Sequence, residues 1–155
     1  MIVVADTSPV NYLVLIGEID LLPKIYRSVL VPEAVRDELL AAESPELVRD
    51  WVSSPPDWFQ VKSIAGSSRE FYGVLDAGEG EAITLATEQR AAIVLIDELA
   101  GRRVALERGF RVVGTIGVLL AAKQKNLVDA DLAADKLLQT NFRISRELLL
   151  LLRIK

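Results

Sequence analysis

Two aspartates follow two short apolar segments, and their positions suit metal-dependent chemistry. Residues 2–5 are apolar and β-branched, which predicts a buried strand, and Asp6 follows them directly. Residues 91–96 repeat the pattern and are followed by Asp97. Because ligands bind beyond the carboxyl ends of parallel strands, we expect both carboxylates to share one cleft. Two such carboxylates repel each other unless a cation lies between them, so the pattern predicts a metal site.

Asp6 also stands where a helix is expected to begin. Thr7 or Ser8 can cap that helix, and Pro9 suits its first position. A simple role in capping is therefore the alternative interpretation of Asp6. Asn11 is either a polar residue of the same cleft or a solvent-exposed helix residue.

A glutamate at the edge of an apolar helix face is the next candidate. Residues 33–42 predict a helix, in which each residue turns by about 100°. Glu38 then falls beside Val35 at the apolar edge, whereas Asp37 points toward water. A carboxylate at an apolar edge is costly unless it is paired or binds a cation. Glu38 is therefore favoured over Asp37, and a solvated surface glutamate is the alternative.

The segment 75–83 predicts the start of another helix and contains two further acids. Gly78 and Gly80 remove side chains from this helix start, which allows close approach of a ligand. Glu79 faces the apolar side but lies at the frayed end, and Glu81 lies on the border of that side. The helical wheel leaves the choice open, and a favourable interaction of these acids with the helix dipole is the simpler interpretation.

The composition restricts the chemistry to oxygen ligands and cationic side chains. The chain of 155 residues has no cysteine and no histidine, which excludes disulfides, a Ser-His-Asp triad and histidine-dependent zinc sites. Carboxylate sites favour hard cations such as Mg²⁺ or Mn²⁺. Hydrophobic residues make up 51% and charged residues 26%, as in globular proteins.

The charge and the apolar segments indicate the cellular setting. The net charge of -4 argues against a generic nucleic-acid coat but not against a nuclease whose metal offsets the acids. No apolar run reaches membrane-spanning length, and no basic segment precedes the first one. We therefore expect a soluble cytoplasmic protein without a membrane partner.

Apolar periodicity and turn residues predict one α/β domain over residues 1–155. Strands are expected at 2–5, 29–31, 58–64, 91–96 and 110–113. Helices are expected at 9–16, 19–26, 33–42, 46–52, from about 76 to 90, 98–108, 115–125, 129–139 and 145–154. Strands that alternate with helices predict a mostly parallel central sheet.

Several motifs together are similar to those of one family. They are Val4-Ala5-Asp6-Thr7-Ser8, Val31-Pro32-Glu33-Ala34-Val35 followed by Glu38, the segment 75–83, Leu95-Ile96-Asp97-Glu98 with Arg102, and the segment 113–119. The sequence resembles PIN-domain proteins, the three-layer α/β/α fold of VapC-type toxin ribonucleases. It looks closest to the branch that begins with Asp-Thr-Ser-Pro.

The resemblance implies a cluster of acids that binds Mg²⁺ or Mn²⁺ and cuts RNA, made of Asp6, Glu38, Glu81 and Asp97. It favours Glu81 over Glu79, because the family's third acid directly precedes an Ala-x-Ile-like run. Thr7 or Ser8 would orient the metal or its water, and Arg102 would contact phosphate.

Two side chains near these motifs keep alternative interpretations. An ion pair with Glu98, one turn earlier, is the alternative for Arg102. Thr115 either caps its helix or sends its hydroxyl into the cleft.

The leading functional hypothesis is a metal-dependent ribonuclease, and the resemblance implies that it is the toxin of a toxin–antitoxin pair. The resemblance also implies an antitoxin partner and a homodimer, for which the leucine-rich segment 145–154 is either dimer surface or core. A non-catalytic PIN-like module that binds RNA or protein is the alternative. A phosphotransfer domain of another α/β type is disfavoured, because a dehalogenase-like phosphatase would need an acid where Ser8 stands.

Overall fold

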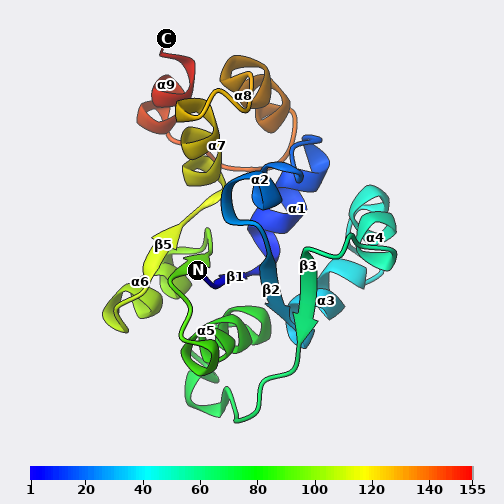
Figure 1. The fold of residues 1–155 in the computed structure, drawn as a ribbon, viewed down its shortest axis with the longest axis vertical. Coiled ribbons are helices and arrows are strands. Elements are labelled where there is room, and N and C mark those ends of the chain that lie inside the picture. Colours follow the sequence, from blue (N-terminus) through cyan, green and yellow to red (C-terminus); the bar gives the residue numbers. More distant parts are fainter. Residues whose placement is uncertain (155) are drawn as a thin grey trace.

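The computed structural model describes residues 1–154, which form an α/β fold (Figure 1). The strands are β1 (Val3–Ala5), β2 (Val29–Pro32), β3 (Phe59–Lys62), β4 (Ile93–Leu95) and β5 (Arg111–Val113). The helices are α1 (Thr7–Leu15), α2 (Leu21–Tyr26), α3 (Glu33–Leu40), α4 (Glu46–Ser53), α5 (Ala77–Gln89), α6 (Leu99–Glu107), α7 (Thr115–Gln124), α8 (Ala130–Leu138) and α9 (Arg146–Arg153), with a short 3₁₀ helix at Arg69–Phe71. The predicted α/β class is confirmed, and every predicted strand is present.

The five strands form one parallel sheet in the order β3-β2-β1-β4-β5. The chain moves outward from β1 to β3 and then returns to the other side of β1 with β4. The order of strands therefore reverses between β1 and β4, and ligands of open α/β sheets bind at such a point. Asp6 follows β1 there, and its backbone N–H donates to the carbonyl oxygen of Leu95 in β4 at 2.8 Å.

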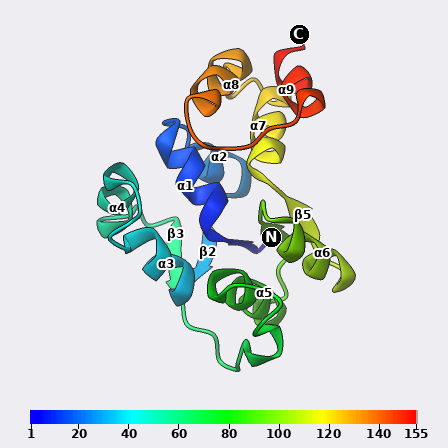
Figure 2. The ribbon, with the colours of Figure 1, turned by 180° about the vertical axis from the view of Figure 1, so that it is seen from behind.

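Helices cover both faces of the sheet, which gives three layers (Figures 1 and 2). Successive side chains of a strand point to opposite faces. Accordingly, Val3 and Ala5 belong to the larger core cluster, which contains buried residues of α1, α2, α7, α8 and α9. Val4 belongs to the smaller cluster on the other face, which is covered by α5. Burial on both faces explains the nearly continuous apolar strands of the sequence.

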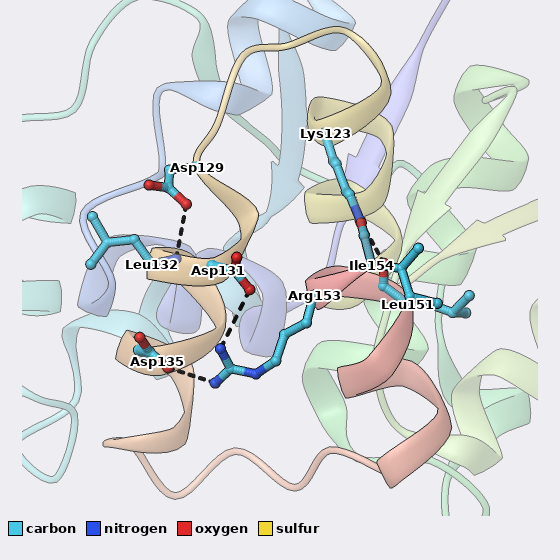
Figure 3. Close-up of polar contacts among 8 residues, drawn as sticks. All are labelled: Lys123, Asp129, Asp131, Leu132, Asp135, Leu151, Arg153 and Ile154. Atoms are coloured by element: carbon cyan, nitrogen blue, oxygen red, sulfur yellow. Dashed lines mark hydrogen bonds and ion pairs between the residues drawn. The ribbon is translucent and has the colours of Figure 1, made fainter.

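Polar contacts join the three C-terminal helices (Figure 3). Arg153 of α9 lies between Asp131 and Asp135 of α8, at 3.5 and 2.5 Å. Lys123 of α7 donates to main-chain carbonyl oxygens at the end of α9, including that of Leu151 at 2.8 Å. Exposed pairs of this kind contribute little stability, so we attribute the docking of α9 mainly to its buried Leu152. Within residues 1–154, no helix is long and apolar enough to span a bilayer.

Candidate metal centre

Asp6 is a buried carboxylate at the reversal point of the sheet. Its side chain is 3% exposed, and its Oδ1 atom has no hydrogen-bond partner. Burial raises the pKa of Asp6 well above its usual value, and the nearby charges of Asp76, Glu79 and Glu38 raise it further, against a backbone hydrogen bond from Thr7 that lowers it. An unpartnered buried carboxylate is unfavourable on its own, so this position suits a bound cation.

Glu79 is the second buried acid beside Asp6. It forms a reciprocal capping box with Asp76 at the start of α5: its N–H donates to Asp76 Oδ1 at 2.8 Å, and its Oε1 accepts from the N–H of Asp76 at 3.1 Å. Its Oε2 atom is buried and has no partner. Burial is the main cause that raises the pKa of Glu79 to about 7. Asp6 and Glu79 therefore each present one unused oxygen in a region of mutual repulsion.

Glu38 lies in the last turn of α3 and is half-buried. Its carboxylate accepts from the hydroxyl of Thr7 at 2.5 Å and from the N–H of Gly78 in α5 at 3.1 Å. A Cβ atom at Gly78 would lie only 2.6 Å from Glu38 Oε1. The glycine is therefore needed for the close approach of this carboxylate to the start of α5.

Asp97 is the fourth candidate acid and follows β4, on the other side of the point where the strand order reverses. It accepts three hydrogen bonds of 2.7 Å, from the Ser8 hydroxyl, the Thr115 N–H and the Thr115 hydroxyl. Thr115 thus points its hydroxyl to the acid, and Gly114 holds the N-cap position of α7. These three donors fix the orientation of the Asp97 carboxylate.

Glu81, which the resemblance favours as the third acid, contacts the start of α3 in this structure. Glu81 Oε1 accepts from the N–H of Ala34 at 3.2 Å, so the side chain satisfies the start of α3. Glu79, not Glu81, is the acid of this helix that influences Asp6. The sequence contained a signal for this arrangement, since Asp76-Ala-Gly-Glu79 has the spacing of a capping box. The capping box holds Glu79 in a defined first turn, so the helix start is not frayed.

Each of the helices α3 and α5 provides a glutamate that caps the N-terminus of the other. Glu38 of α3 binds an N–H in the first turn of α5, and Glu81 of α5 binds an N–H in the first turn of α3. Each contact satisfies a donor that has no partner within its own helix. We call this arrangement the reciprocal cap.

The remaining predicted residues also lie at this edge of the sheet. Thr7 and Ser8, at the start of α1, orient Glu38 and Asp97 by hydrogen bonds. Arg102 is half-buried, and its Nη1 donates to the carbonyl oxygen of Ile96 at 3.2 Å. Among residues 1–154 it forms no ion pair with Glu98, the alternative that the sequence left open.

The N-termini of α1, α5 and α7 converge on the acids, and their positive dipole ends offset part of the negative charge. In the described part of the chain, no three acids are arranged to enclose an ion as they stand. The donor set nevertheless fits a hard cation, because it consists of carboxylate oxygens, of which two are buried and unpartnered. Ion binding would require Glu38 or Asp97 to exchange present hydrogen bonds for the ion.

The comparison with protein families agrees with the fold. The profile of DUF3368, described as a PIN domain, matches residues 2–153. The chain belongs to this PIN-domain family. No curated protein and no solved structure matched significantly.

Proposed function

We propose that this PIN domain is a metal-dependent ribonuclease whose Mg²⁺ or Mn²⁺ is held by Asp6, Glu38, Glu79 and Asp97. The observation that supports the proposal most strongly is the pair of unpartnered buried oxygens on Asp6 and Glu79. Glu79 takes the place that the sequence prediction gave to Glu81. The charge of Glu79 raises the pKa of Asp6, whereas the Glu81 carboxylate accepts a hydrogen bond at the start of α3.

The protein groups divide the work of such a site. A bound divalent ion supplies an activated water and charge stabilisation for phosphodiester hydrolysis. Asp6 and Glu79 supply the buried negative charge that attracts the ion. Thr7, Ser8 and Thr115 hold Glu38 and Asp97 in place by hydrogen bonds. No protein nucleophile is required, which agrees with a chain without histidine and cysteine.

Titration calorimetry with Mn²⁺ tests the proposed ligands. The metal-free protein is titrated at about pH 8, where Glu79 is largely ionised. Asp6→Asn and Glu79→Gln are expected to abolish binding, because each removes a charge and keeps the shape. Glu81→Gln is the matched control from the same helix and is expected to bind normally. Loss of binding in Glu81→Gln with normal binding in Glu79→Gln would show that Glu81, and not Glu79, is the metal ligand.

Cleavage of RNA by the metal-loaded protein tests the activity itself. We expect cleavage that requires Mg²⁺ or Mn²⁺ and is lost in Asp6→Asn and Asp97→Asn. A metal concentration of about 1–10 mM is enough to fill typical protein sites for divalent ions. RNA binding without cleavage at this concentration would instead favour the non-catalytic binding module.

The proposal includes the partners that the resemblance implies, namely an antitoxin and a second copy of the chain. Several leucines of α8 and α9 are exposed and offer apolar surface for such contacts: Leu132, Leu138, Leu148, Leu150 and Leu151. Light scattering after gel filtration measures the oligomeric state. Dimers with interfaces of standard size are expected to form at micromolar concentration. A protein that stays monomeric at that concentration would contradict the homodimer.

A further inference from the structure

A groove of about 900 Å³ opens beside Asp97 and follows the edge strand β5. Its walls come from α6, β5, α7 and residues 139–145, which connect α8 to α9 and which we call the C-terminal strap. Figure 2 shows the strap crossing from α8 to α9 on the side of α1 and α7. The volume lies near the upper end of ligand pockets, so the groove can hold an extended ligand.

The groove collects positive charge in a chain that is acidic overall. Arg102 comes from α6, Arg111 from β5 and Arg143 from the strap. Within residues 1–154, none of these three arginines forms an ion pair. The acids of the groove wall are Asp97 and Glu98, at the end that adjoins the metal centre. The chain as a whole has a net charge of -4, so a groove with these three arginines differs in charge from the rest of the protein.

The strap is fixed to the same helix that carries part of the metal centre. The Tyr12 hydroxyl of α1 donates to Asn141 Oδ1 at 2.6 Å, and the rings of Tyr12 and Phe142 meet edge to face at 4.9 Å. Tyr12 lies one turn after Ser8, whose hydroxyl binds Asp97. The contacts of Arg153 and Lys123 hold the flanking helices together (Figure 3). The position of the strap is therefore coupled to that of the acids.

We propose that this groove binds a single strand of RNA, with Arg111 and Arg143 contacting its phosphates and the strand entering the metal centre at Asp97. The inference rests on the proposed nuclease function, and it names the path of the substrate. Guanidinium groups match phosphate geometry well. Tyr12 and Phe142 line the same groove, and aromatic side chains favour the unpaired bases of single strands.

Fluorescence anisotropy tests the groove without cleavage. A labelled single-stranded RNA of about ten nucleotides is titrated with the full chain in EDTA. Arg111→Ala and Arg143→Ala are each expected to weaken binding about five-fold at about 0.1 M salt and to lower the slope of log affinity against log salt by about 0.7. Arg103→Ala and Arg146→Ala are matched controls, because both residues are exposed and lie outside the groove wall. These controls are expected to bind like the parent.

Unchanged affinity of both arginine variants would overturn the inference, and so would three other results. They are equal weakening by the control variants, absence of RNA binding by the parent, and competition by poly-glutamate as strong as that of RNA, which would indicate an acidic protein partner. The nuclease proposal fails separately. RNA that binds through Arg111 and Arg143 but is not cleaved with Mn²⁺ would leave the groove in place and refute the activity. Cleavage with unchanged affinity of both arginine variants would do the reverse.

Discussion

Replacing Glu79 by glutamine is expected to stabilise the metal-free protein while it removes metal binding. Glu79 is 5% exposed, its Oε2 has no partner, and burial raises its pKa to about 7. A glutamine keeps the Oε1 acceptor for the N–H of Asp76 and removes the buried charge. Removal of that charge also relieves Asp6, whose pKa it helps to raise.

The expected size of the effect follows from the pKa shift and depends on pH. The folded protein holds the Glu79 proton up to about pH 7, whereas the unfolded chain loses it near the ordinary value of 4.5. The folded state therefore binds more protons between these values, so the stability of the parent falls as pH rises through this window. A shift from 4.5 to about 7 corresponds to at most about 3 kcal/mol at pH above 7. For a chain of 155 residues this is roughly 6–12 °C in Tm.

Thermal unfolding in EDTA at a series of pH values measures this difference. Glu79→Gln and the parent are expected to unfold together near pH 4 and to separate progressively toward pH 8, roughly the two ends of the titration window. Glu81→Gln is the control, and it should lower stability by up to about 1 kcal/mol, because it weakens a charged contact at the start of α3. A Glu79→Gln variant that is less stable than the parent at the upper pH, or equally shifted at every pH, would refute the reasoning.

Three further variants test two contacts of the site and, as a control, the packing of the core. Gly78→Ala places a Cβ 2.6 Å from Glu38 Oε1. We expect roughly a 10-fold loss of Mn²⁺ affinity by calorimetry and little change in the free energy of unfolding. Unchanged affinity would contradict this role of the glycine. Thr115→Val removes a hydroxyl donor to Asp97 and is expected to cost about 1.5–3 kcal/mol in urea unfolding; a neutral effect would argue against that contact. Leu137→Ala removes a side chain with 0% exposure from the core and should cost about 2–5 kcal/mol without loss of metal affinity, as urea unfolding and calorimetry can show.

Local patterns in the sequence predicted the sheet and singled out Asp6, Glu38 and Asp97 as candidate acids. The apolar runs before Asp6 and Asp97 are sufficient to predict buried strands, because a parallel strand that is buried on both faces has apolar residues throughout. The profile match to the PIN-domain family and the parallel sheet confirm the fold class that these runs indicated. The residues of the metal centre stay a prediction until metal binding is measured.

Contacts between distant elements explain what the sequence did not predict. The choice between Glu79 and Glu81 depends on where α3 packs, since Glu81 finds the N–H of Ala34, 47 residues away in sequence. The groove was not predicted, because Arg111 and Arg143 come from a strand and from the C-terminal strap. The periodicity of one segment does not predict which distant segments it contacts in the fold.

The reciprocal cap makes one backbone amide a reporter of the metal centre. If Glu38 turns toward an ion, the N–H of Gly78 loses its carboxylate partner and becomes free to exchange with solvent. Binding of a cation would then increase the global resistance to unfolding while it accelerates hydrogen exchange at this single position. Opposite changes in these two quantities would show that α3 and α5 exchange a helix cap for a ligand, so that occupancy of the site can be measured without any nucleic acid.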